Sequence, residues 1–298
     1  MNYNQLGISA LKVSEIGFGC MSLGRNSQEA EAIINRAMEL GINYFDTADL
    51  YDKGLNEEMV GALLHSRRDQ IVIATKAGNR WKEDGSGWDW DASKEYIIAA
   101  AENSLRRLKT DYIDLYQLHG GTMDDPIDET IEAFEILKKQ GKIRYYGISS
   151  IRPNVIREYV SKSNIVSVMM QYSLLDRRPE ESCLDLLHDH HISVVTRGSL
   201  AQGLLVNKPA KSYLSYTAEE VERAARAVCF VGGGKRSPAQ TAVRFALQHP
   251  AVTSVVLGIR TMEQLEDLAT SPETSPLTKA ELAFLKESVK PNYYEQHR

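Results

Sequence analysis

Four residues with titratable side chains stand where predicted buried strands end. Asp46, Lys76 and His119 each follow an apolar segment directly, and Tyr51 comes five residues after Asp46. A carboxylate, an ammonium, an imidazole and a phenol together can hold and transfer a proton. In a barrel of parallel strands the carboxyl ends face a common mouth, where titratable groups usually carry out chemistry. The four residues therefore predict a proton-transfer site.

The acid and the amine of this set are expected to compensate each other. Asp46 keeps the Lys76 ammonium charged, and a charged ammonium beside the Tyr51 phenol stabilises the phenolate, so that Tyr51 serves as an acid near neutral pH. His119 would orient and polarise a carbonyl through a hydrogen bond. Taken singly, Asp46 also suits a turn or helix cap, Lys76 a surface position and His119 a structural role. Their agreement at three strand ends favours chemistry.

The segments that must position these residues alternate between short apolar runs and amphipathic stretches, which predicts eight strand-helix units. The candidate strands are 16–19, 42–46, 71–76, 113–118, 143–148, 166–171, 192–197 and 254–258. The candidate helices are 28–40, 56–65, 93–108, 127–140, 153–162, 180–190, 237–248 and 262–270. The fold class is α/β. We predict one (β/α)8 barrel domain over 1–298, with an N-terminal hairpin at 3–13 that closes one end and an extra C-terminal helix at 278–289.

Composition excludes several classes of function. Apolar residues make up 43% of the 298, charged residues make up 25%, and the net charge is −5, so neither a basic nucleic-acid surface nor a membrane span is expected. The first residues lack the pattern of an export signal. Three widely spaced cysteines, Cys20, Cys183 and Cys229, form neither a disulfide framework nor a metal motif. We expect a cytoplasmic protein without nucleic-acid or membrane partners.

Three motifs that suggest other functions fail on their spacing. Gly17-Phe-Gly19 begins a dinucleotide fingerprint, but Ser22 holds the third glycine position. Gly232-Gly233-Gly234-Lys235 lacks the leading glycine of a phosphate loop, because Cys229 stands there. His190 and His191 have no accompanying ligand cluster, which leaves a metal-dependent hydrolase as a weak alternative and no metal as the expectation.

Several segments together resemble one family. The segment 41–51 (GINYFDTADLY), followed by NEEMVG at 56–61, resembles the first signature of the aldo-keto reductases. Later blocks resemble that family in the same order and at suitable spacing: ATKAG at 74–78, DLYQLH at 114–119, GIS at 147–149, QYS at 171–173 and the stretch 258–264. The resemblance covers almost the whole chain and is to the bacterial NADPH-dependent branch. It implies a barrel enzyme that reduces an aldehyde or ketone to an alcohol by hydride transfer, with Tyr51 as the general acid.

The same resemblance implies a nicotinamide cofactor and the residues that bind it. Ser149 and Gln171 would hold the carboxamide, Asp46 would touch the ribose, and Arg260 with Gln264 would meet the adenosine end. The full implied set is Gly19, Cys20, Met21, Asp46, Ser149, Ser150, Gln171, Arg197, Gly198, Ser199, Leu200, Gln202, Gly203, Gly258, Arg260 and Gln264. A guanidinium suits a 2′-phosphate, which favours NADPH, although one arginine leaves NADH as an alternative. Cys20 is equally well explained as a buried, inert thiol.

Three positions depart from the family pattern. Ser150 stands where relatives often have an asparagine, Leu268 where an adenine-binding asparagine is frequent, and Arg197 where an aromatic ring commonly stacks on the nicotinamide. The planar guanidinium of Arg197 can also stack, but it brings a positive charge. Each departure bears on cofactor affinity, and none touches the four residues at the mouth.

The segment 79–92 follows the third strand and would lie on the rim of the same mouth. It contains Trp81, Trp88 and Trp90, which we expect to line a substrate pocket, although core packing is the alternative for any tryptophan. The expected partner is a small-molecule carbonyl compound, and the family's habit implies a monomer. A second function that the fold allows is a cofactor-binding sensor or regulatory subunit with little turnover, as in potassium-channel β subunits.

Overall fold

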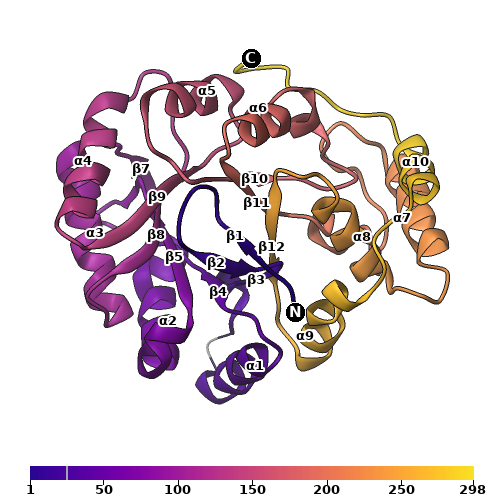
Figure 1. The fold of residues 1–298 in the computed structure, drawn as a ribbon, viewed down its shortest axis with the longest axis horizontal. Coiled ribbons are helices and arrows are strands. Elements are labelled where there is room, and N and C mark those ends of the chain that lie inside the picture. The colour runs from indigo at the N-terminus through magenta and orange to yellow at the C-terminus, as the bar shows by residue number, and fades with distance from the viewer. Residues whose placement is uncertain (25) are drawn as a thin grey trace.

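The computed structural model describes residues 1–24 and 26–298, and a closed barrel of parallel strands lies at its centre (Figure 1). Around the barrel the strand order is β10-β11-β12-β3-β4-β5-β8-β9. The bounds are β3 (Ile16–Gly19), β4 (Tyr44–Asp46), β5 (Val72–Ala77), β8 (Ile113–Leu118), β9 (Ile143–Ser149), β10 (Ser167–Gln171), β11 (Ser193–Arg197) and β12 (Val252–Gly258). The predicted (β/α)8 barrel is confirmed.

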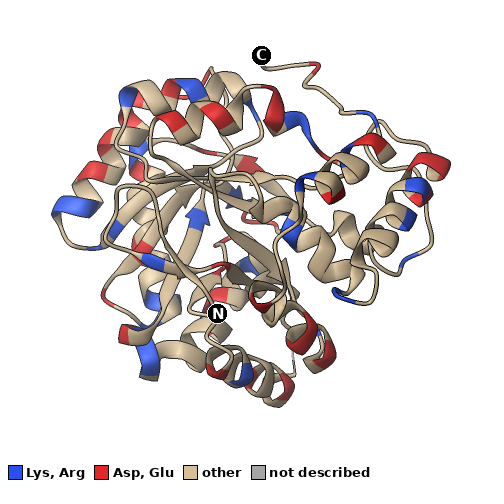
Figure 2. Ribbon diagram, turned by 45° about the vertical axis from the view of Figure 1, so that its right-hand side comes forward, with Lys and Arg blue, Asp and Glu red and all other residues tan. Residues whose placement is uncertain are grey.

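Helices form the outer layer and cover the barrel strands on all sides (Figure 1). They are α1 (Ser27–Glu39), α2 (Leu55–Leu64), α3 (Lys94–Leu108), α4 (Ile127–Lys139), α5 (Pro153–Lys162), α6 (Cys183–Asp189), α7 (Ala218–Gly232), α8 (Pro238–Leu247), α9 (Met262–Ala269) and α10 (Lys279–Ser288). The predicted C-terminal helix is therefore present as α10. Basic and acidic residues are interspersed along these helices (Figure 2). Among the described residues, no helix is both long and apolar enough to cross a membrane.

The N-terminal hairpin closes one end of the barrel, as predicted. Its strands β1 (Tyr3–Gln5) and β2 (Lys12–Ser14) lie across the barrel in Figure 1. Leu6, Leu11 and Val13 pack against the apolar side chains that point into the barrel. Because this end is filled, access to the interior is left to the carboxyl ends of the strands.

The interior of the barrel consists of an apolar layer beneath a polar one. Tyr44, Ala74, Leu115, Met169 and Val195 belong to the inner apolar cluster. Side chains on a strand alternate between its two faces, so the residue two positions further on points the same way. Those next positions are occupied by Asp46, Lys76, Gln117, Gln171 and Arg197. The strand period thus gathers the polar groups in one layer at the open end.

Two segments differ from their predicted form. The segment 79–92, expected as a loop, contains an antiparallel hairpin of β6 (Asn79–Trp81) and β7 (Trp88–Trp90), in which Trp81 pairs with Trp88. The helix expected at 180–190 is split into η4 (Arg178–Glu181) and α6, because Ser182 has an extended φ of −160°. Other short 3-10 turns are η1 (Cys20–Ser22), η2 (Tyr51–Gly54), η3 (His65–Gln70), η5 (Ala201–Gly203) and η6 (Ser271–Glu273).

Helix α2 approaches α3 closely at Gly61. A Cβ atom placed on Gly61 would lie 2.5 Å from the carbonyl oxygen of Arg107 and 2.7 Å from the Cα of Leu108. Both contacts are with backbone, which cannot move aside as a flexible side chain can. The missing side chain therefore lets α2, which supports the mouth, pack against its neighbour.

Gly61→Ala is expected to destabilise the protein by about 1–3 kcal/mol, because the new methyl group overpacks this contact. Urea unfolding measures the change. Gly87→Ala is the matched control, since a Cβ there has nothing within 4 Å, and it should cost less than about 0.5 kcal/mol. Equal stabilities for the two variants would contradict the close approach of α2 and α3.

Candidate active site

A buried ion pair lies at the centre of the polar layer. The Nζ of Lys76 donates hydrogen bonds to Asp46 Oδ1 at 2.6 Å and to the carbonyl oxygen of Thr47 at 2.7 Å. The two residues are 0% and 4% exposed. Burial is the largest single effect and lowers the pKa of Lys76, but the charges of Asp46 and Tyr51 together with the hydrogen bond to Asp46 outweigh it, so the pKa of Lys76 is raised. Burial also raises the pKa of Asp46, and Lys76 opposes that shift. Each group is thus the main compensation for the other.

Tyr51 and His119 stand beside this pair. The Lys76 ammonium lies 5.3 Å from the centre of the Tyr51 ring. The rings of Tyr51 and His119 meet edge to face, with centres 5.9 Å apart and planes at 86°. The structure therefore brings together all four residues of the predicted proton-transfer set, although they come from three strands and a loop.

The loop that carries Tyr51 is held by hydrogen bonds on both sides. The backbone N–H of Asp49 donates to the Lys76 carbonyl at 3.1 Å, and the Trp81 indole N–H donates to the Leu50 carbonyl at 3.1 Å. Asp49 is buried, and burial together with the charge of Glu57 raises its pKa to about 7. These contacts fix the backbone on which Tyr51 sits.

His119 is held in its neutral form. Burial, followed by the charges of Lys76 and Arg197, lowers the pKa of His119 to about 3. Its Nδ1 is buried and has no hydrogen-bond partner among the described residues. The Trp90 ring packs against Gly78 and Gly120, the loop glycines next to this strand end. A neutral imidazole can donate one hydrogen bond to a bound oxygen without adding charge to the mouth.

Gln117 is a member of the polar layer that sequence reasoning did not identify. It is fully buried, is paired in register with Lys76 and lies near enough to Asp46 to lower the pKa of that acid. Its side-chain amide makes no hydrogen bond to the described residues in this geometry. The inward direction of Gln117 could have been predicted from the alternation of side chains along the strand, because Gln117 comes two positions after the inward-facing Leu115.

Helix α2 supports the mouth from outside through two buried polar residues. Asn56 accepts from the Thr47 hydroxyl at 2.6 Å and donates to the Cys20 carbonyl at 2.8 Å. Glu57 accepts from the Thr75 hydroxyl at 2.5 Å and pairs with Arg107 at 2.6 Å. The neighbours of Asp46 and Lys76 are thus tied to one helix.

The strand ends opposite the ion pair carry the predicted carboxamide ligands. The Ser149 hydroxyl bonds to none of the described residues, which leaves it available. Ser150 is buried, and its hydroxyl accepts from the Arg152 N–H at 3.2 Å. Gln171 donates to the Tyr213 hydroxyl at 3.1 Å and accepts from the Arg197 guanidinium at 2.9 Å.

The loop after β11 has a run of residues with left-handed backbone. Positive φ angles occur at Gly198, Ala201, Gln202 and Gly203. Gly198 passes close to Gln171, since a Cβ there would lie 3.2 Å from the Gln171 Cγ. Within the loop, the backbone N–H groups of Ala201 and Gly203 donate to the carbonyl oxygens of Gly198 and Leu200, both at 2.8 Å. Ser199 is buried and its hydroxyl is within 3.1 Å of the Thr196 hydroxyl, while Leu200 is half-buried.

A hollow of about 340 Å³ lies between the loops that follow β3 and β12. It is lined in part by Met21, Ser22, Glu29 and Arg260. Gln264 accepts from the Arg260 backbone N–H at 3.0 Å, which places both predicted adenosine-end residues at this edge. Gly19 and Gly258 are neighbours in register at the two strand ends.

Two residues near this hollow point away from it. Cys20 is fully buried, its thiol donates to the Phe18 carbonyl at 3.7 Å, and burial raises its pKa above the ordinary value. The structure therefore supports the inert alternative for its side chain. Leu268 is 3% exposed and packs in the core.

The three tryptophans have different environments on the rim. Trp81 and Trp88 meet edge to face at 5.6 Å, Lys53 lies 5.1 Å from the Trp81 ring, and Trp88 is 53% exposed. Trp90 is half-buried and donates from its indole to Asp125 at 2.7 Å. Trp90 thus supports the loops of the mouth, while Trp81 and Trp88 present aromatic surface on the hairpin.

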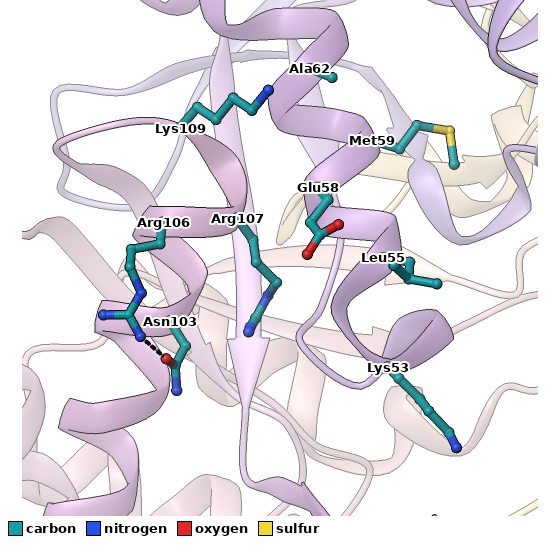
Figure 3. Close-up of a pocket in the computed structure, with 9 residues that line it drawn as sticks. All are labelled: Lys53, Leu55, Glu58, Met59, Ala62, Asn103, Arg106, Arg107 and Lys109. Atoms are coloured by element: carbon teal, nitrogen blue, oxygen red, sulfur yellow. Dashed lines mark hydrogen bonds between the residues drawn. The ribbon is translucent and has the colours of Figure 1, made fainter.

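A second hollow has a volume of about 790 Å³ (Figure 3). It is open to the outside between α2 and α3 and is lined by Lys53, Leu55, Glu58, Met59, Ala62, Asn103, Arg106, Arg107 and Lys109. Arg107 is already paired with the buried Glu57. Within residues 1–24 and 26–298, no group of three or more His, Cys, Asp or Glu residues is arranged to hold a metal ion.

Comparisons with known proteins agree with this geometry. A sequence model described as the Aldo/keto reductase family matches residues 15–290. The chain is 54% identical to the uncharacterized oxidoreductase YqkF of Bacillus subtilis (strain 168), over 100% of both. It is 33% identical to the uncharacterized oxidoreductase YrpG of the same organism, over 92% of both. The solved holo form of aldo-keto reductase AKR11C1 from Bacillus halodurans is 52% identical, with a TM-score of 0.95, over 100% of this chain and 99% of that one.

Lys76→Met is expected to destabilise the protein by about 3–5 kcal/mol, because it leaves the buried Asp46 without its compensating charge. Adding Asp46→Asn should restore part of that loss. Chemical denaturation of both single variants and the double variant measures the coupling. Strictly additive effects of the two substitutions would show that the residues do not stabilise each other.

His119 should make stability depend on pH. Its pKa is about 3 in the folded state and about 6.5 when unfolded, so the unfolded chain takes up the proton first and stability falls as pH drops below about 6.5. Between pH 7 and 5 the wild type should lose about 2 kcal/mol more than His119→Gln. Denaturation at both pH values tests this. His188→Gln, at an exposed position on α6, is the control and should keep the wild-type slope, whereas an unchanged slope in His119→Gln would refute the assignment.

Proposed function

The chain belongs to the aldo/keto reductase family, and we propose that it reduces an aldehyde or ketone to an alcohol, with NADPH as the hydride donor and Tyr51 as the general acid. Family membership and the oxidoreductase names of the relatives support carbonyl reduction in general. The single observation that carries the finer proposal is the contact of Lys76 with both Asp46 and Tyr51 at the carboxyl ends of the strands.

The residues opposite the ion pair fit a nicotinamide dinucleotide. When bound, NADPH supplies the hydride that no side chain can provide. Ser149 and Gln171 have hydroxyl and amide groups suited to the carboxamide, and the tight loop at 198–203, with positive φ at four of its residues, suits a pyrophosphate. Arg260, in the hollow beside α1, suits a 2′-phosphate. This arginine favours NADPH, and NADH remains the alternative donor.

Each residue at the mouth then has a defined task. Tyr51 donates its phenolic proton to the carbonyl oxygen as negative charge develops there. Lys76 stabilises the phenolate that remains, and Asp46 keeps Lys76 charged and in place. The neutral His119 donates a hydrogen bond that orients the same oxygen. Hydrogen-bond donors that are already in position stabilise the negative charge that develops on this oxygen in the transition state, and such stabilisation is usually the largest contribution to the rate enhancement.

The aromatic residues near the mouth suggest the kind of substrate. Trp81 and Trp88 offer aromatic surface for a small-molecule carbonyl compound with an apolar body. We propose that residues 1–298 act as one barrel domain and as a cytoplasmic monomer. A sensor with little turnover would need the same cofactor contacts but not the aligned phenol, ammonium and imidazole.

Tyr51→Phe should lower kcat for carbonyl reduction by about 100-fold or more, because the general acid is lost. Binding of NADPH should change little, since Tyr51 is not among the proposed cofactor ligands. Steady-state NADPH oxidation with a panel of aldehydes and fluorescence titration of NADPH measure the two quantities.

Tyr145→Phe is the matched control. The Tyr145 hydroxyl accepts from the Ala10 N–H at the closed end of the barrel, so this variant should keep its rate. Comparable rates for Tyr51→Phe and the wild type would exclude the assigned acid. Tight cofactor binding without turnover of any carbonyl by the wild type would instead indicate the sensor function.

A further inference from the structure

One buried carboxyl group next to the mouth has no task in the proposed reaction. Asp49 lies two residues before Tyr51 and is 8% exposed. Its Oδ2 accepts a hydrogen bond from the Tyr96 hydroxyl of α3 at 3.3 Å, while its Oδ1 is buried and has no hydrogen-bond partner among the described residues. Its backbone N–H donates to the Lys76 carbonyl at 3.1 Å. The residue therefore connects the loop that carries Tyr51 to an outer helix and to a barrel strand.

Charged and titratable groups face Asp49 from three elements. Glu57 of α2 opposes its negative charge, whereas Arg107 and the Tyr96 hydroxyl, both of α3, favour it. Tyr116 of β8 stays un-ionised, because burial raises its pKa and the charge of Asp49 raises it further. Burial is the largest effect on Asp49, and together with Glu57 it raises the pKa of the carboxyl group to about 7. Asp49 can therefore gain or lose a proton near neutral pH.

The ionised form of Asp49 lowers the stability of the fold. An aspartate in an unfolded chain has a pKa of about 3.9, well below the value of about 7 in the folded protein. The folded protein thus holds the proton more tightly, and this group makes stability fall as the pH rises from about 4 to about 7. A neutral asparagine would avoid the cost. A carboxyl group placed where its charge destabilises the fold indicates a role in function rather than in folding.

We propose that Asp49 is a positioning residue for Tyr51, because its ionised carboxylate holds the loop of the proton donor against Tyr96 of α3 and the uptake of a proton weakens that contact. This inference rests on the proposed function, since it takes Tyr51 as the general acid. A hydrogen bond to an ionised acceptor is about twice as strong as one between neutral groups. A displacement of about 1 Å in a reacting group can cost about 100-fold in rate. The rate of carbonyl reduction should therefore fall as Asp49 is protonated.

The test is the pH dependence of kcat with saturating NADPH and aldehyde. We expect kcat of the wild type to fall by about fivefold to tenfold as the pH is lowered through about 7. Asp49→Asn is neutral at every pH, so its kcat at about pH 8 should equal the low value of the wild type in acid, and the inflection near pH 7 should be absent. Urea unfolding at about pH 8 should show this variant to be at least as stable as the wild type, which separates a loss of positioning from a loss of folding.

Tyr96→Phe tests the partner of the carboxylate. Removing the Tyr96 hydroxyl takes away a hydrogen bond that favours the ionised form, so the inflection should move to higher pH and kcat in mild base should fall. Asp46 is another acid whose pKa is raised, but Lys76 contacts it rather than Tyr96, so its titration should not move. Two matched controls should keep the wild-type rate and inflection: Tyr145→Phe, at the closed end of the barrel, and Asp189→Asn, exposed at the end of α6.

An unchanged inflection in Asp49→Asn would overturn the inference and leave the proposed function intact, because the wild type would still reduce carbonyls. If the wild type reduces no carbonyl, the proposed function fails, and hydrogen exchange of the backbone amides at 47–54 still tests the contact. After correction for the intrinsic exchange rate, these amides should exchange faster at about pH 6 than at about pH 8 in the wild type, and equally at both in Asp49→Asn. Equal exchange at both pH values in the wild type would also overturn the inference.

Discussion

The ion pair between Lys76 and Asp46 is the interaction on which the mouth of this barrel depends. Neither group would remain charged in so buried a place without the other. Their backbone neighbours are in turn fixed from outside, since Thr47 and Thr75 bond to Asn56 and Glu57 of α2. The pair therefore links the packing of an outer helix to the position of Tyr51, the proposed proton donor.

The barrel provides this arrangement through the strand period alone. An apolar layer that includes Tyr44, Ala74 and Leu115 fills the lower interior, and the hairpin closes the end beneath it. The next inward positions are polar and meet at the open end, because parallel strands all finish there.

Much of this could be predicted from the sequence, because short apolar runs that alternate with amphipathic stretches, together with the order of the motifs, indicate a parallel barrel. As predicted, β4 ends at Asp46, β5 ends one residue after Lys76, and β8 ends one residue before His119. The hairpin at 79–90 was missed although Asp84-Gly85 is a turn signal, because the paired segments 79–81 and 88–90 are short and contain no apolar run. Contacts between segments distant in sequence, such as that of Arg197 with Gln171, could not be predicted because they depend on register and side-chain direction.

The most direct measurement of the central claim is the single-turnover rate of carbonyl reduction by Lys76→Met preloaded with NADPH, at a temperature where the variant is folded. The account predicts a loss of about 100-fold or more with cofactor affinity changed only a few-fold, because the phenol of Tyr51 loses the charge that stabilises its conjugate base. A rate close to that of the wild type would contradict the claim that the buried ion pair makes Tyr51 an effective acid.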